Sequence, residues 1–212
     1  MPCPICEKRP PRRLCPAKGE TICAVCCGTE REVTIDCPSD CTYLHASRRY
    51  DLERREVDRS KVPFADTRIP ASFVMEHEEL LLALSYALCA AARDNRLVAD
   101  SDVVASLQAL AETYKTLTSG IYYEKLPDFR VQREIYDALK LAIEEFKKVA
   151  TQRAGIGSLK DSEIRDALIF LAQLGATHTN GRPKGRAFLD FLRSQFKPGE
   201  FSKPASNIVL LP

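Results

Sequence analysis

The sequence predicts a mainly α-helical protein, in which a small N-terminal module with a short β-hairpin and a helix precedes an all-helical bundle of about five helices. Eight of the nine cysteines lie among the first 41 of the 212 residues, a segment too short to fold around a hydrophobic core alone. Beyond residue 72, apolar residues recur with the period of a helix, and no window alternates as a strand would. We therefore expect a module over 1–62, a linker over 63–72, a bundle over 73–197 and a tail over 198–212.

The N-terminal cysteines and one histidine have the spacing of metal ligands. Two Cys-x2-Cys pairs and a Cys-x3-Cys-x3-His run supply thiolate and imidazole groups at distances along the chain that a tetrahedral Zn²⁺ accepts. The candidate ligands are Cys3, Cys6, Cys15, Cys23, Cys26, Cys27, Cys37, Cys41 and His45. Nine candidates are one more than two four-coordinate sites require. The simplest interpretation is two zinc ions per chain and one spare ligand.

The compartment that the sequence predicts favours metal binding over disulfide formation for these cysteines. The chain begins without the apolar stretch of a signal peptide, which predicts a cytoplasmic protein with reduced thiols. The longest apolar run, over 80–92, is too short to cross a membrane and has charged residues on both sides. We therefore expect no membrane association, and read this run as a buried helix of the bundle with Cys89 as a core residue.

Inside the module, β-branched residues predict two short strands over 21–25 and 31–35, with Gly28 available for a turn. Pro38 and the acidic Asp40 suggest that a helix begins at Cys37, which would place Cys41 and His45 on one helix face. The assignment of ligands to sites stays open. One partition pairs Cys3 and Cys6 with Cys37 and Cys41, and another pairs them with Cys23 and Cys26.

A cysteine pair, a hairpin and a helix that begins among ligands resemble the treble-clef zinc folds. The interleaved pattern that ends in Cys37, Cys41 and His45 is similar in particular to MYND-type and HIT-type zinc fingers, over about the first fifth of the chain. This resemblance implies two zinc ions bound in a cross-braced manner and a role in protein interaction. Those fingers end with a further cysteine four residues past the histidine, where this chain has Arg49.

Apolar residues at helical spacing mark five helices in the remainder, and a capping residue at Asp100 or Ser101 opens the second. The five apolar stretches are 73–88, 103–114, 135–146, 164–174 and 187–196. The sequence contains no Walker loop, nucleophile elbow or His-Glu-x-x-His motif. These absences, together with surplus thiolates that would close a zinc site, predict a protein that is not an enzyme.

Three functions are compatible with this pattern. The first is an adaptor, in which structural zinc holds a module that binds another protein. The second is binding to nucleic acid, through basic residues in the loop between the first ligands and in a turn-rich segment near the C-terminus. Those basic residues are Arg9, Arg12, Arg13, Arg182, Lys184 and Arg186. The third is a zinc–thiolate redox switch at the adjacent Cys26 and Cys27. The partner and the oligomeric state stay open.

Overall fold

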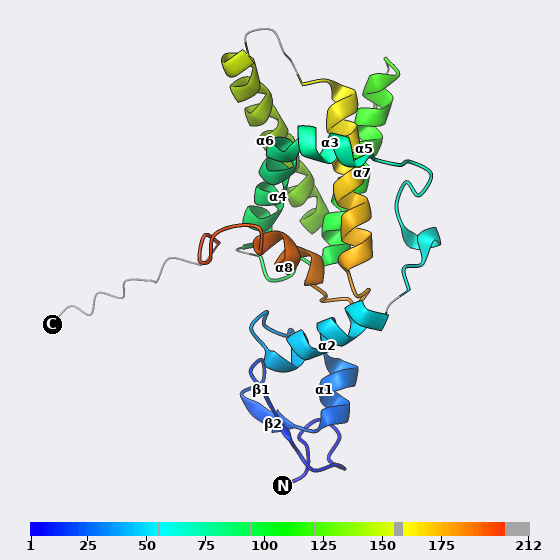
Figure 1. Cartoon of the computed structure of the whole chain (residues 1–212). Coiled ribbons are helices and arrows are strands. Elements are labelled where there is room, and N and C mark those ends of the chain that lie inside the picture. The colour runs from blue at the N-terminus through cyan, green and yellow to red at the C-terminus, as the bar shows by residue number, and fades with distance from the viewer. Residues whose placement is uncertain (55, 94, 121, 155–158, 202–212) are drawn as a thin grey trace, which may run out of the picture.

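A computed structural model of the chain describes residues 1–54, 56–93, 95–120, 122–154 and 159–201. In this part the protein is mainly helical, and its only two-stranded sheet lies near the N-terminus, which confirms the predicted fold class. Figure 1 shows the N-terminal module below a taller group of helices, with α2 between the two. Most of the predicted tail lies outside the described residues.

The hairpin exists, but its strands precede the segments that the sequence predicts. Strands β1 (Arg13–Cys15) and β2 (Glu20–Ile22) are antiparallel, with Leu14 opposite Thr21. The chain then enters helix α1 (Ala24–Glu30), because the Cys23 sulfur accepts the backbone N–H of Cys26 and caps the helix. This local cap overrides the strand preference of the β-branched residues around it.

The segment over 31–35 forms a turn with one isolated bridge between Arg31 and Ile35, where a strand was predicted. The Ile35 N–H closes back onto the Glu30 carbonyl at 2.9 Å. Gly28 lies inside α1 with no positive φ, so the turn role predicted for it is wrong. Helix α2 (Thr42–Arg54) begins five residues after Cys37, because the Cys41 N–H instead closes a turn onto the Pro38 carbonyl.

The bundle begins with a break that the apolar pattern does not reveal. One helix was predicted from residue 73, but the structure has α3 (Ala71–Glu76) and α4 (Glu78–Arg93). His77 ends α3 with φ −114° and stacks on Phe73, with ring centroids 4.2 Å apart. The remaining helices are α5 (Asp100–Thr118), α6 (Arg130–Ala154), α7 (Asp161–His178) and α8 (Ala187–Arg193).

One apolar core joins the helices of the bundle, as the helical periodicity predicts. Fully buried side chains come from five helices and include Leu84, Leu107, Leu139, Leu168 and Phe188. The segment that connects module and bundle contains a 3₁₀ turn (Arg59–Lys61) and is bound to the bundle surface: the Gln173 side-chain amide donates to the Phe64 and Thr67 carbonyls, both at 2.9 Å. Within the described residues, no helix has the length and apolar character needed to cross a membrane.

Candidate metal centre

Four N-terminal cysteines come together in the module. The sulfur atoms of Cys3, Cys6, Cys23 and Cys26 all lie within 4.8 Å of one another. Cys3, Cys23 and Cys26 are 0%, 2% and 6% exposed, and Cys6 is half-buried. The structure therefore selects one of the two partitions that the sequence leaves open, with the two Cys-x2-Cys pairs in the same site.

Local backbone geometry positions each pair. After Cys3 the chain makes a tight turn in which the Glu7 N–H donates to the Cys3 carbonyl at 2.8 Å, and Glu7 takes a φ of +52°. Cys23 and Cys26 lie at the start of α1, one at the cap and one in the first turn. Backbone N–H groups also point at the sulfurs: Cys23 donates to the Cys3 sulfur at 3.2 Å. Such donors stabilise thiolates over thiols.

The electrostatics of the cluster favour a bound cation. Burial acts to raise the pKa of Cys3, but backbone N–H donors from Cys23, Cys6 and Ile5 outweigh it and lower that pKa to about 6. Burial and the neighbouring thiol groups, Cys23 foremost, raise the pKa of Cys26 to about 12. The Cys3 thiol thus ionises readily and the Cys26 thiol does not, because each further thiolate in the cluster is repelled by the negative charge already present. A divalent cation removes that repulsion.

The donor set fits a structural metal. Four thiolates complete a tetrahedral shell and leave no position for water or substrate, which is the arrangement of structural rather than catalytic zinc. Soft sulfur ligands select Zn²⁺ or another thiophilic metal and disfavour Mg²⁺ or Ca²⁺. The four cysteines could therefore hold one metal ion, and their chemistry is that of a fold-stabilising centre.

The other predicted ligands have different surroundings. Cys15 and Cys41 are buried, and Cys27 and Cys37 are half-buried, and none of them belongs to the set of four. His45 is exposed on α2, and the structure does not bring it into the cluster. Cys89 is fully buried in the bundle core, as the sequence predicts.

The basic residues near the C-terminus contact the module. Arg182 donates to the Gly28 and Arg31 carbonyls at 3.1 and 2.5 Å, at the C-terminal end of α1. The Lys184 ammonium donates to the Thr34 carbonyl at 2.9 Å, and Arg186 pairs with Asp36 at 2.7 Å. These three residues, named above as candidates for nucleic-acid binding, therefore join the bundle to the module. Sequence spacing carries no signal for these contacts.

Glu32 is the centre of this interface. Its side chain is 1% exposed and accepts from Arg48 at 2.7 Å and from the Asn180 amide at 2.5 Å. Its carbonyl accepts the Lys184 N–H at 2.8 Å. A buried carboxylate is stable only when paired and hydrogen-bonded in this way. The interface escapes sequence analysis because its residues resemble ordinary surface charges.

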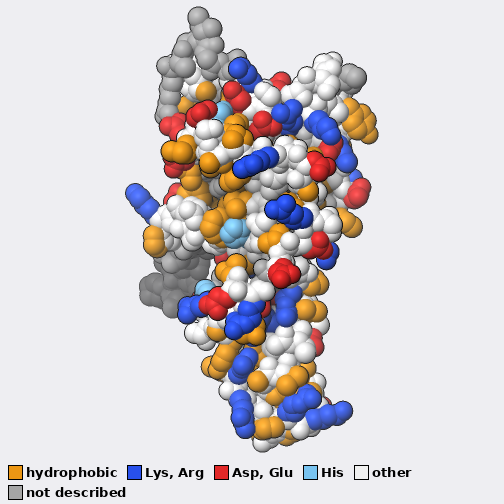
Figure 2. Space-filling model, turned by 45° about the vertical axis from the view of Figure 1, so that its right-hand side comes forward, with side chains coloured by type: hydrophobic (Ala, Val, Ile, Leu, Met, Phe, Trp, Pro, Cys, Tyr) orange, Lys and Arg blue, Asp and Glu red, His pale blue; other side chains and the backbone are white. Residues whose placement is uncertain are grey.

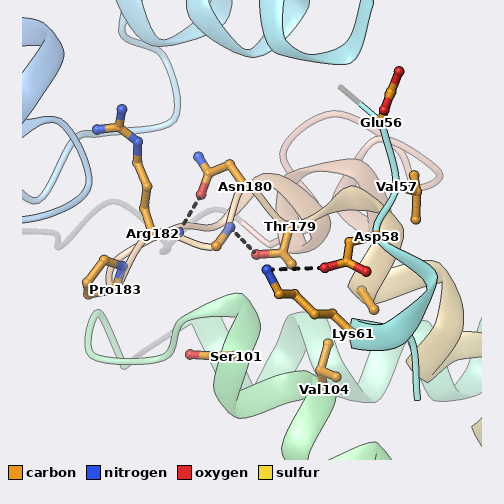
Figure 3. A pocket seen from close by; sticks show the side chains of 12 residues that line it. Glu56, Val57, Asp58, Lys61, Ser101, Val104, Thr179, Asn180, Arg182 and Pro183 are labelled. Carbon is orange, nitrogen blue, oxygen red and sulfur yellow. Dashed lines mark hydrogen bonds and ion pairs between the residues drawn. The ribbon is translucent and has the colours of Figure 1, made fainter. Parts of the chain in front are cut away.

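A cavity of about 470 Å³ lies beside this interface, between the segment after α2 and the bundle (Figure 3). Its polar contacts are internal: Lys61 pairs with Asp58 at 3.4 Å, and the Asn180 side chain accepts the Arg182 N–H at 3.0 Å. Ser101 and Val104 of α5 also line the cavity. Nothing in this lining forms a set of groups suited to acid–base or nucleophilic chemistry.

Comparisons of the chain with models of protein families, with curated proteins and with solved structures found no match. The resemblance to MYND-type and HIT-type zinc fingers therefore depends on ligand spacing alone. The observation that the structure adds is a cluster of four cysteines able to hold a metal ion.

Proposed function

We propose that the protein is a non-enzymatic adaptor, in which zinc holds the N-terminal module in a conformation that binds another protein. The observation that carries this proposal is the set of four cysteine sulfurs, three of them in buried residues, all within 4.8 Å of one another. A module of this size lacks the core to fold alone, and a structural zinc site contributes on the order of 10 kcal/mol toward its folding. The metal ion then stabilises the fold of the module and takes part in no reaction.

The free end of the module supplies a surface for the partner. Leu14 on β1 is 63% exposed and Val25 on α1 is 47% exposed, although both are apolar. Lys8 and Arg12 are exposed in the adjoining loop. Figure 2 shows basic and hydrophobic side chains together at this lower end of the molecule. Apolar anchors with a basic surround suit a protein partner that has an apolar contact face and acidic residues at its rim.

A pull-down from the native host tests the adaptor. The baits are the intact protein, Cys23→Ser, and a surface variant with Leu14→Glu and Val25→Glu. Leu141→Glu is the matched control, because Leu141 is also exposed but lies on α6 of the bundle. A protein captured by the intact bait and the control, and lost from the other two, is expected. Equal capture by all four baits would reject the module as the binding surface.

Nucleic-acid binding is a second candidate, limited to Arg9, Arg12 and Arg13. Arg9 and Arg12 are exposed and Arg13 is half-buried, whereas the three C-terminal candidates contact the module. Arg13 is partly engaged, since its guanidinium lies 4.9 Å from the Tyr43 ring centroid. Phosphate contacts predict affinity that falls steeply with salt. A gel-shift series without binding at low salt would remove this candidate.

A further inference from the structure

Four further sulfurs of the module, those of Cys15, Cys27, Cys37 and Cys41, lie outside the first cluster. Cys15, Cys27 and Cys37 pack in the same small apolar cluster as Ile35 and the four cysteines of the first site. The side chain of Cys37 lies within electrostatic range of both Cys41 and Cys15. Cys15, Cys27 and Cys37 therefore lie beside the first site, and Cys41 lies near Cys15 and Cys37.

Local backbone structure positions three of the four: Cys15, Cys37 and Cys41. The Cys15 carbonyl accepts the Lys18 and Gly19 N–H groups at 3.1 and 2.9 Å, so a compact turn follows Cys15. Cys41 lies directly before α2, a helix of 13 residues whose first N–H groups favour a nearby anion. Cys37 directly precedes the turn that the Cys41 N–H closes onto the Pro38 carbonyl.

Helix α1 contributes to both groups. Cys26 and Cys27 are consecutive, and consecutive residues on a helix point about 100° apart. Cys26 belongs to the first cluster, so Cys27 projects in a different direction. One short helix can thus carry a ligand for each of two metals.

A buried guanidinium marks this second group. Arg31 is only 7% exposed, and its Nη2 atom donates to the Cys27 sulfur at 3.7 Å. Among the described residues, no other side-chain hydrogen bond or ion pair of this guanidinium is found. A buried positive charge is costly unless an anion accompanies it. A thiolate fixed by a metal would be that anion, and four thiolates around Zn²⁺ carry a net charge of −2 that Arg31 would partly neutralise.

We infer that Cys15, Cys27, Cys37 and Cys41 form a second tetrathiolate metal site, that Arg31 is its neighbouring counter-charge, and that His45 is not a ligand. This inference deepens the proposed function, since it depends on zinc in the first site. Within the described part of the chain, only the first group has all its sulfurs within 4.8 Å. Closure of the second site therefore requires the four sulfurs to move closer together around the metal.

The test is metal stoichiometry of the purified full-length protein, by elemental analysis and native mass spectrometry. We expect two zinc ions per chain in the wild type and in His45→Ala, and one in Cys37→Ser, Cys41→Ser and Cys6→Ser. One zinc per wild-type chain, or two retained in Cys41→Ser, would overturn the second site. Loss of a zinc ion in His45→Ala would overturn the assigned ligand set.

Two measurements keep the inference testable if a cysteine variant does not fold. Titration of metal-free wild type with Co²⁺ should reach two equivalents, both with thiolate-to-metal absorption, and saturation at one equivalent rejects the second site. Arg31→Gln should weaken the binding of one of the two zinc ions about tenfold in chelator competition, the size expected when a residue that contacts a metal ligand is removed. Equal affinities in Arg31→Gln and wild type would remove Arg31 from the site.

The outcomes separate this inference from the adaptor. One metal per chain together with zinc-dependent capture of a partner would reject the second site and retain the proposed function. Two metals per chain without any captured partner would support the second site and reject the adaptor.

Discussion

Arg48 and Asp190 are 142 positions apart in the sequence and form an ion pair of 2.6 Å between α2 and α8. The other terminal nitrogen of Arg48 pairs with Glu32 of the module at 2.7 Å. One guanidinium therefore connects the turn after α1, helix α2 and the last helix of the bundle. Its planar fork suits two carboxylates in a way that a lysine ammonium would not.

Arg48→Ala should destabilise the protein by about 3 kcal/mol, because removal of one partner leaves the buried Glu32 carboxylate with too little compensation. Arg48→Lys should recover only part of that loss, since it cannot bridge both carboxylates. Arg49→Ala is the matched control: Arg49 is exposed, and its removal should change stability by less than about 0.5 kcal/mol. Urea unfolding of the three variants measures the effect, and equal midpoints for Arg48→Ala and Arg49→Ala would contradict it.

Metal removal should loosen the contact between module and bundle. The Lys184 N–H donates to the Glu32 carbonyl, and Arg182 donates to the Gly28 and Arg31 carbonyls. These acceptors follow Cys26 closely in the chain, so their positions depend on the folded module. Chelation should therefore increase hydrogen exchange at Lys184, whereas the amide of Leu107 in the core helix α5 should stay protected. Unchanged protection at Lys184 would show that the segment over 28–34 holds its place without metal.

Sequence patterns predicted the features that depend on short-range spacing or on helical periodicity. The Cys-x2-Cys spacing of Cys3, Cys6, Cys23 and Cys26 indicated a metal site, and the apolar periodicity indicated the helices of the bundle. The predicted strands were misplaced because a helix cap can override the strand propensity of the residues around it. The residues over 21–25 favour a strand, yet the Cys23 sulfur caps a helix at that point, an effect that a propensity scale does not include.

The interface between module and bundle could not be predicted at all. Glu32, Arg48, Asn180 and Asp190 are polar residues with no shared periodicity, and in sequence each is indistinguishable from a solvated surface residue. Only the fold brings them together, across separations of up to 148 residues. For the same reason, Arg182 and Arg186 suggested a basic patch when read in sequence, although their side chains contact the module.

Asp100 makes the bundle more stable as the pH falls toward 5. Its carboxylate is buried and accepts the Phe188 and Leu189 N–H groups at the start of α8, at 3.0 and 3.1 Å. Burial raises its pKa from 3.8 to about 6, although those two N–H groups oppose the shift. Because the folded state holds the proton more tightly than the unfolded state, this contribution is complete below pH 4 and is lost as the pH rises through 6.

Asp100→Asn isolates this contribution, since the amide does not titrate. Between pH 7 and pH 5, the free energy of unfolding of the wild type should rise by about 1 kcal/mol relative to that of Asp100→Asn. Denaturation of both proteins at the two pH values, with metal content matched, gives the difference. A constant difference between the two proteins would mean that Asp100 titrates at its ordinary pKa.

Two glycines in helices should respond to alanine in opposite directions. A Cβ atom at Gly175 in α7 would lie 2.8 Å from Val104 Cγ2 and 2.9 Å from Phe188 Cε1, closer than packed carbon atoms approach. Gly175→Ala should therefore cost about 1–2 kcal/mol, since the overpacking exceeds the helix propensity that alanine adds. A Cβ at Gly28 in α1 meets nothing within 4 Å, so Gly28→Ala should stabilise the protein by about 0.5 kcal/mol.

Thermal unfolding of the two variants measures this contrast, and the double variant Gly175→Ala/Val104→Ala tests its cause. Truncation of Val104 removes the nearest of the clashing atoms, so it should cost less in the Gly175→Ala background than in the wild type. Additive effects of the two substitutions would mean that α7 moves away from α5 as a unit. In that case the close approach of the two helices at Gly175 would not be what fixes their separation.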